Sequence, residues 1–165
     1  MALTQLDMQI LDILFEDART APAAAAAMLG VSESDVAGAI RHLEEEKVIV
    51  GYPALINWDK TEIEKVKAVI EVKVTPQRDM GFDAIAARIY RFDEVVNVYL
   101  MSGAYDLMLE VQATNMRTLA NFVSQKLSTL DHVLSTATHF VLKKYKVDGV
   151  VLDADHTDKR LAVSP

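Results

Sequence analysis

The chain has 165 residues, of which 51% are hydrophobic and 25% charged, with no cysteine and a formal net charge of −7. This length suits one domain or two small ones, with a core large enough to fold without a disulfide or a metal. Without cysteine there is no disulfide framework, thiolate zinc site or cysteine nucleophile. The acidic balance by itself does not favour nucleic-acid binding.

The sequence predicts a cytoplasmic protein without a membrane partner. The first twenty residues carry acidic side chains early and lack the basic start of a signal peptide. Their apolar residues are periodic rather than continuous. No apolar run reaches the roughly 18 residues that a spanning helix requires.

Residues 1–50 have the pattern of three helices. Thr4 can cap the first helix, and Asp7 lies in its first turn, where the helix dipole favours a negative charge. One face of this helix is apolar at Leu6, Ile10, Ile13 and Leu14.

A second short helix is expected from Pro22, and Gly30 supplies its stop. Ser32 caps a third helix, which has Asp35 in its first turn and ends near Lys47. The apolar stripe of this third helix consists of Val36, Ala39, Ile40 and Leu43.

A hairpin is predicted for residues 48–56, which are rich in β-branched residues around a central Gly51-Tyr52-Pro53. Three short helices followed by a hairpin make the winged helix-turn-helix pattern over residues 1–56. A purely structural three-helix bundle is the alternative. Residues 57–65 are polar and charged and form the predicted linker.

Residues 66–147 predict a second domain, so the expected fold class is α+β. Apolar residues alternate in segments 66–74 and 107–111, and segments 95–101 and 133–147 are also predicted to be strands. Two segments between the strands, led by Phe82 and by Thr114 as a cap, have helical spacing. The order β-α-β-β-α-β is the ferredoxin-like arrangement. It leaves one sheet face without helices, which predicts at least a homodimer. Residues 148–165 are expected to be a tail, of which 150–152 could dock.

Four segments together resemble the Lrp/AsnC, or feast/famine, family of transcriptional regulators. They are an opening helix, a turn with recognition helix and wing, a glycine-tyrosine-aspartate turn and a closing strand: LDMQILDILFEDAR, MLGVSESDVAGAIRHLEEEKVIVGYPALIN, MSGAYDLMLEV and LSTATHFVLKKYK. The resemblance implies a cytoplasmic regulator that binds double-stranded DNA through its first domain. It also implies a second domain that forms dimers, often assembled into octamers, with an amino acid or similar metabolite bound between sensor domains.

The DNA-binding residues predicted on this basis are Ser32, Ser34, Arg41, His42 and Lys47. The hydroxyls and the helix N-terminus can hold phosphates, and the others are basic or titratable. Family members usually carry a basic residue just before the position of Ile40, and this chain does not.

The charge of the first domain favours a second hypothesis. Residues 1–60 hold four basic and ten acidic residues, a net charge of −6. Because non-specific DNA affinity comes mostly from neutralised phosphates, such a domain offers few contacts per subunit. A metabolite-binding oligomer that has lost DNA recognition is therefore the alternative function.

The predicted effector site lies in the 102–106 turn and on the last strand. A turn with glycine presents backbone N–H groups to a carboxylate, a carboxylate can accept from an ammonium group, and a tyrosine offers a wall. Hydroxyls on the strand can bind a ligand head group. The candidates are Ser102, Gly103, Tyr105, Asp106, Ser135, Thr136 and Thr138. The alternative is that they only form a β-turn and a strand.

No enzyme, cofactor or metal site is predicted. The histidines, His42, His132, His139 and His156, do not have metal-ligand spacing with an acidic partner. There is no glycine-rich phosphate loop and no nucleophile motif. A remote alternative is an enzyme similar to the sirohaem decarboxylases, which share this architecture but need basic and histidine residues clustered around an acidic macrocycle.

Overall fold

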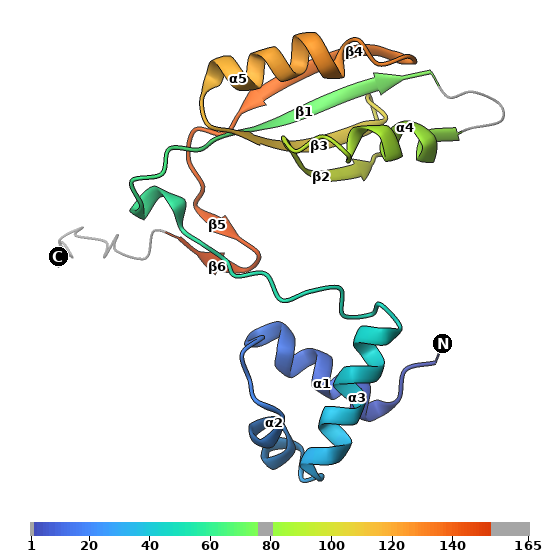
Figure 1. Ribbon diagram of the computed structural model, residues 1–165, viewed down its shortest axis with the longest axis vertical. Helices are drawn as coiled ribbons and strands as arrows, with labels where there is room; N and C mark the ends of the chain where they lie inside the picture. The colour runs from blue at the N-terminus through green and yellow to red at the C-terminus, as the bar shows by residue number, and fades with distance from the viewer. Residues whose placement is uncertain (1, 76–80, 153–165) are drawn as a thin grey trace, which may run out of the picture. The chain divides into compact units, whose positions relative to one another are not determined.

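Residues 2–75 and 81–152 are described by the computed structural model, which divides the chain between Ile56 and Asn57 into two units. The first unit is helical and the second is a four-stranded sheet with helices (Figure 1). Each unit has its own hydrophobic core.

The first unit contains α1 (Gln5–Glu16), α2 (Pro22–Leu29) and α3 (Glu33–Glu45). Gly30 ends α2 in the left-handed region at φ 68°, where a glycine avoids the Cβ clash of other residues. The predicted helices are therefore present, and their apolar stripes meet in one core made of Ile10, Leu14, Ala25, Ala26, Val36 and Leu43.

Reciprocal hydrogen bonds fix the starts of α1 and α3. The Asp7 backbone N–H donates to the Thr4 hydroxyl (3.1 Å), and the Thr4 backbone N–H donates to Asp7 Oδ2 (2.8 Å). Two bonds accepted by Asp7 Oδ2, first the one from the Thr4 backbone N–H and then one from the Thr4 hydroxyl (2.8 Å), hold the pKa of Asp7 below its ordinary value. At α3, the Asp35 backbone N–H donates to the Ser32 hydroxyl at 3.1 Å.

The predicted hairpin at residues 48–56 is wrong: this segment follows α3 as an extended loop with no strand. The backbone N–H groups of Val48 and Ile49 both donate to the Leu43 carbonyl, at 2.9 and 3.0 Å, and so close the helix end instead of starting a strand. Pro53 has no N–H to contribute to a ladder. An isolated two-stranded hairpin is marginally stable in water, so β-branched residues alone do not create one. The first unit is a helix-turn-helix without a wing.

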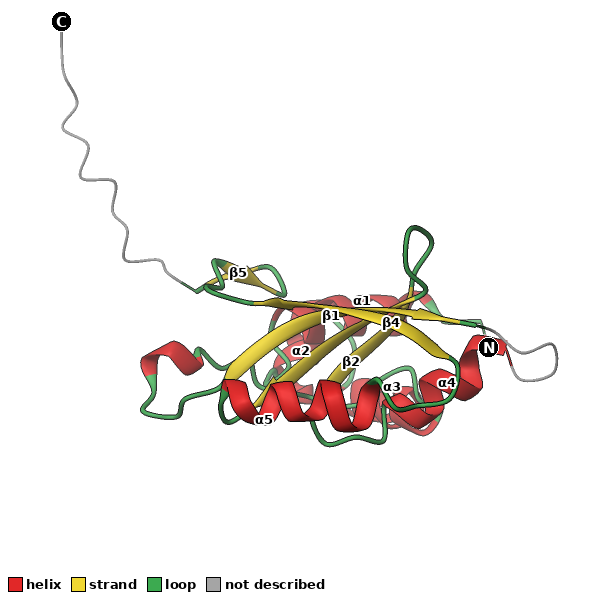
Figure 2. Ribbon diagram, turned by 90° about the horizontal axis from the view of Figure 1, so that it is seen from above, coloured by secondary structure: helices red, strands yellow, loops and turns green. Residues whose placement is uncertain are grey.

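The second unit has the predicted βαββαβ order. Its elements are β1 (Val66–Val74), α4 (Gly81–Ile89), β2 (Val95–Leu100), β3 (Leu107–Ala113), α5 (Met116–Asn121) continued by the π-helical η2 (Phe122–Leu127), and β4 (Val133–Phe140). The sheet is antiparallel with strand order β2-β3-β1-β4. Both α4 and α5 cover the same face of it (Figure 2). Asn115, rather than the predicted Thr114, caps α5.

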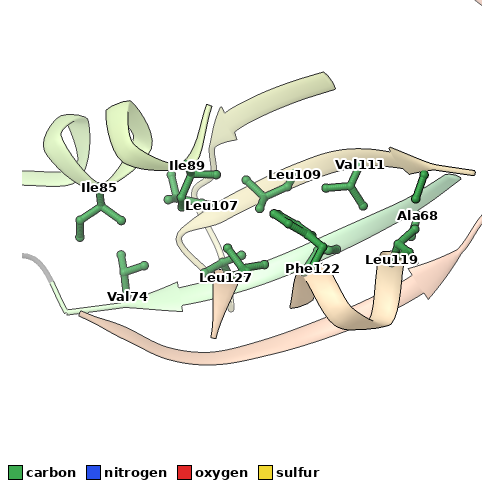
Figure 3. Close-up of a cluster of buried hydrophobic side chains, with 13 residues drawn as sticks. Ala68, Val74, Ile85, Ile89, Leu107, Leu109, Val111, Leu119, Phe122 and Leu127 are labelled. Carbon is green, nitrogen blue, oxygen red and sulfur yellow. The ribbon is translucent and has the colours of Figure 1, made fainter. Parts of the chain in front are cut away.

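The core of the second unit lies between this sheet face and the helices. Alternate residues of β1 point into it, and Ile70 and Val72 lie opposite Leu109 and Leu107 of β3. Figure 3 shows the helix side chains that meet them, Ile85, Ile89, Leu119, Phe122 and Leu127. The alternation in the sequence therefore predicts the buried face of the sheet correctly.

The end of the second unit differs from the prediction. The last strand stops at Phe140 instead of reaching residue 147, and a separate hairpin follows, with β5 (Lys146–Val147) and β6 (Val150–Val151). Its turn residues Asp148 and Gly149 have φ 45° and 82°, as a two-residue type I′ turn requires. The predicted linker contains the 3₁₀ helix η1 (Trp58–Lys60). Of the predicted tail, residues 153–165 lie outside the described residues.

The capping box at Thr4 gives a pH prediction. Because the pKa of Asp7 is depressed in the folded state, its contribution to stability is present above the ordinary value of 3.8 and is lost as the pH falls through the folded pKa. We expect Asp7→Asn to destabilise the first unit at neutral pH. Between about pH 5 and pH 3 the free energy of unfolding of the variant should fall less than that of the wild type.

This is measured by urea unfolding of the helical signal at a series of pH values. Asp12→Asn, at an exposed position of the same helix, is the matched control and should keep the wild-type pH profile. A wild-type profile for Asp7→Asn as well would contradict the role of the capping box.

Candidate nucleic-acid interface and ligand site

The exposed face of α3 is the candidate nucleic-acid interface. It lies opposite the buried Val36 and Leu43, and residues at spacings of four, seven and eleven share it: Ser34, Gly38, Arg41 and Glu45. This face therefore offers one cation and, around Gly38, open space where a Cβ would meet no atom within 4 Å. Because glycine has no side chain, the DNA can approach this face of the helix closely.

The hydroxyls predicted to bind phosphate already have partners. The Ser32 hydroxyl donates to Asp35 Oδ2 at 2.6 Å, and Ser34 Oγ lies 2.8 Å from Ser32 Oγ. Glu33 and Asp35 occupy the first turn of α3 beside them. A phosphate at this helix end would therefore meet two carboxylates together with the N–H groups.

The structure does not bring all five predicted DNA-binding residues together. Ser32 and Ser34 lie at the start of α3, whereas Arg41 and His42 are exposed near its end. Arg41 lies nine positions after Ser32, which is roughly 14 Å along the helix. Lys47 is exposed just beyond the helix, in a left-handed conformation at φ 59°.

Glu44 holds the loop that follows α3, which the sequence did not indicate. The Tyr52 hydroxyl donates to Glu44 Oε1 at 2.8 Å. Desolvation, and then this bond to a carboxylate, raises the pKa of Tyr52. Of the three consecutive glutamates 44–46, Glu44 therefore has a structural role and is not only a solvent-exposed charge.

Asp106 ties the candidate ligand turn to β1. Its Oδ2 accepts from the Val74 backbone N–H at 2.9 Å, and its own N–H donates to the Val72 carbonyl at 3.1 Å. Its carbonyl accepts from the Met101 N–H at 2.8 Å and so closes the turn. Asp106 thus has a structural role, and one carboxylate oxygen is engaged before any ligand arrives.

The other residues of this turn are more accessible. Ser102 and Gly103 are exposed, and Tyr105 is half-buried. The Tyr105 hydroxyl lies 4.0 Å from Met108 Sδ on β3. The turn thus presents an exposed backbone beside a partly buried aromatic ring.

The three hydroxyl residues of β4 lie on two different faces of the sheet. Thr136 pairs with Val72 and Thr138 with Ile70, so both threonines share the helix-covered face with the core. Ser135 pairs with Lys73 and lies on the other face. Ser135 therefore does not share a face with the two threonines, because neighbouring residues of a strand alternate between faces.

Val72 connects the turn and the threonines. Asp106 bonds to the Val72 backbone from the β3 side, and Thr136 lies opposite Val72 on the β4 side. Two strand spacings, roughly 9–10 Å, separate β3 from β4. The turn and Thr136 thus lie at one end of the sheet on either side of β1, without touching one another.

The sheet face without helices is mixed rather than apolar. Its side chains include Val69 and Met108 but also charged groups: His139 Nε2 lies 3.4 Å from Glu71 Oε1, and Asn97 Nδ2 donates to Glu110 Oε2 at 2.9 Å. Partial burial, and then the adjacent Lys67, lowers the pKa of Lys144 to about 8. A partner that covers this face must therefore match polar groups as well as apolar ones.

Within the described residues there is no group of three or more histidine, aspartate or glutamate side chains that could hold a metal ion. No single helix among them is long and apolar enough to cross a membrane. Only α2 and α3 taken together, bent by 114°, meet that length and composition among the described residues, and they share the core of the first unit with α1.

Comparisons with known proteins identify the class that this fold and these sites define. The model of the AsnC-type helix-turn-helix domain matches residues 3–44, and that of the Lrp/AsnC ligand binding domain matches residues 67–151. The chain belongs to the Lrp/AsnC family, and it is a DNA-binding transcriptional regulator with a ligand-binding second domain. The family that the sequence resembles is confirmed.

Individual relatives agree with this assignment. The chain is 52% identical over 166 residues to the HTH-type transcriptional regulator YugG of Bacillus subtilis (strain 168), with both chains fully covered. It is 25% identical to the leucine response regulatory protein LrpA of Mycobacterium tuberculosis, with a TM-score of 0.74 and coverage of 88% and 97%. A regulator of Neisseria meningitidis in complex with L-Met, 24% identical, has the same fold at a TM-score of 0.72, with coverage of 92% and 98%.

The bonds of Asp106 give a stability prediction. Asp106→Ala leaves the Val74 N–H without its acceptor, so we expect it to lower the free energy of unfolding of the second unit by about 1–3 kcal/mol. Asp106→Asn keeps an acceptor oxygen and should lose less. Urea unfolding followed by the fluorescence of Trp58, the single tryptophan, measures both variants. Equal stability of Asp106→Ala and the wild type would contradict the role of these bonds.

Proposed function

We propose that this regulator acts in the cytoplasm as a homodimer or larger homo-oligomer, binds double-stranded DNA through α3, and responds to an amino acid bound at the 102–106 turn and β4. The observation that carries the proposal is the exposed face of α3 in a helix-turn-helix, with Arg41 opposite the buried Val36 and Leu43. A helix presented in this way fits the major groove of B-DNA.

The charge of the first unit limits how strongly each copy binds. With a net charge of −6 over residues 1–60, only Arg41, Lys47 and, when protonated, His42 can neutralise phosphates along α3 and its end. An oligomer overcomes this limit because linked copies bind as one unit, with a higher combined affinity. This supports DNA binding by an assembly rather than by a single copy.

The chemistry of the ligand site favours an α-amino acid. Exposed backbone at Ser102 and Gly103 suits a carboxylate, the second oxygen of Asp106 suits an ammonium group, and Tyr105 forms a wall. The Thr136 hydroxyl lies at the same end of the sheet, across β1. A relative from Rhizobium meliloti, 31% identical over 87% of this chain, is a leucine-responsive regulatory protein, and the Neisseria structure contains L-Met.

The alternative, a metabolite-binding oligomer without DNA recognition, has a specific observation in its favour. At the start of α3 the Ser32 hydroxyl is engaged by Asp35, the Ser34 hydroxyl is paired with that of Ser32, and Glu33 lies beside them. An enzyme related to sirohaem decarboxylases has less support, because His42 belongs to the first unit while His132 and His139 lie in the second, without a shared basic cluster among the described residues. The family points to a regulator.

The DNA-binding role of Arg41 is tested by fluorescence anisotropy with DNA from the upstream region of the gene, titrated at several salt concentrations. If Arg41 contacts a phosphate, Arg41→Ala should weaken binding to all sequences and reduce the slope of log K against log salt by about 1 per contact. Arg19→Ala, which removes the same charge from an exposed position outside α3, is the control. Equal losses in the two variants would remove Arg41 from the interface.

The ligand site is tested by thermal unfolding with a panel of amino acids. An amino acid at 100 times its Kd should stabilise the second unit by about 2.7 kcal/mol. Thr136→Val removes a hydroxyl but keeps the side-chain shape. The variant should need about ten times more amino acid than the wild type to reach the same stabilisation. Ser135→Ala, on the opposite face, should not. The site fails if Thr136→Val behaves like Ser135→Ala or if no amino acid stabilises the wild type.

A further inference from the structure

The linker and the last described residues of the second unit are joined by a hydrogen bond that spans 95 residues of sequence. The Asn57 Nδ2 group donates to the Leu152 carbonyl at 3.1 Å. The other end of the same amide, Oδ1, accepts from the Asp59 backbone N–H at 3.2 Å and caps η1. One side chain therefore both starts the helical turn of the linker and attaches it to the end of the second unit.

The segment that receives this bond has its own order. Asp148 and Gly149 form the type I′ turn between β5 and β6, and the Leu152 N–H donates back to the Tyr145 carbonyl at 3.0 Å. This closed hairpin presents the Leu152 carbonyl in a defined place.

Further contacts hold the same region. The Lys65 ammonium lies 3.6 Å from the centre of the Trp58 ring, a cation–π contact that folds the linker on itself. The Thr61 hydroxyl donates to the Trp58 carbonyl at 2.8 Å. The Asp59 carboxylate lies within electrostatic range of the Lys144 ammonium, on the segment that leads into β5. The linker is therefore ordered by contacts from Asn57 to Lys65.

We propose that residues 145–152 form a latch that holds the linker at Asn57 and so shortens the free tether of the DNA-binding unit. With the latch closed, the tether begins at Asn57. With the latch open, residues 57–65 join the tether, and a flexible chain of nine residues has an end-to-end distance of roughly 16 Å. A tether longer than the span between two bound sites lowers the effective concentration of each helix-turn-helix at the second site, and so lowers the gain from binding both sites at once.

The latch is also continuous with the candidate ligand strand. Residues 141–144 run directly from β4, which carries Thr136 and Thr138, into the hairpin, and the Val141 N–H extends the pairing by donating to the Lys67 carbonyl at 2.9 Å. A shift of β4 is thus passed to the latch through the chain itself. The contact between Asn57 and Leu152 is supported by the hydrogen bonds described above, whereas its effect on DNA binding rests on the proposed function.

The contact is tested by limited digestion of the full chain with trypsin, with mass spectrometry of the cuts after Lys60 and Lys65. Asn57→Asp keeps an oxygen that can cap η1 but loses the donor to Leu152. A chain that ends at Val147 removes the acceptor while keeping β1 to β4. The matched control is Asn115→Asp, the same chemical change at the cap of α5, outside the latch.

We expect both latch variants to be cut in the linker about two- to tenfold faster than the wild type, which is the opening expected from one lost hydrogen bond, and Asn115→Asp to be cut at the wild-type rate. Equal rates in the wild type and both latch variants would overturn the proposal. A faster cut in Asn57→Asp alone would also overturn it, since the fault would then lie in the cap.

A second readout separates the latch from the proposed function. Opening the latch should reduce the preference for a duplex with two copies of the bound site over a duplex with one copy, and leave one-copy affinity unchanged. If the wild type binds no DNA, the proposed function fails while the digestion still decides whether the latch exists. A faster digestion with an unchanged two-copy preference would overturn the role of the latch in DNA binding.

Discussion

The central strand β1 is the constraint on which the second unit depends. It pairs with β3 on one side and β4 on the other, and its residues Ala68, Ile70, Val72 and Val74 are each no more than 4% exposed. A slip of one residue would move all four to the face without helices, so burial fixes the register strongly. That register in turn places Thr136 on the core side and Ser135 on the open side. It also places the carbonyl of Val72 and the N–H of Val74 where Asp106 can bond to both.

Features that depend on nearby residues were readable from the sequence. The capping pairs Thr4–Asp7 and Ser32–Asp35 and the stop at Gly30 involve residues within a few positions, and their geometry is set by backbone dihedrals alone. The alternation in β1 and β3 likewise reports burial directly. These local signals were enough to predict the helix-turn-helix and the βαββαβ order.

Features that depend on distant partners could not be read in this way. The bond from Val74 to Asp106 spans 32 residues, so a sequence motif for a turn cannot reveal that the carboxylate is already engaged. The segment 48–56 shows the opposite failure, because β-branched residues predicted strands that have no sheet to join. The Asp148-Gly149 pair was a usable hairpin signal, but the alternation before it favoured one long strand.

The residues that stabilise the helices of the first unit also work against its approach to DNA. Asp7 in the first turn of α1 accepts from the Thr4 backbone N–H, and Asp35 in the first turn of α3 accepts from the capping Ser32 hydroxyl. Glu44 holds the loop after α3, so these charges cannot be removed without a cost in folding. A unit stabilised in this way gains little from counterion release. Affinity must then come from joining several weak units, and the gain from joining falls once the tethers are longer than the span between the bound sites. By shortening the tether, the hydrogen bond from Asn57 to Leu152 therefore offsets part of the DNA affinity that the acidic helices lose through charge repulsion.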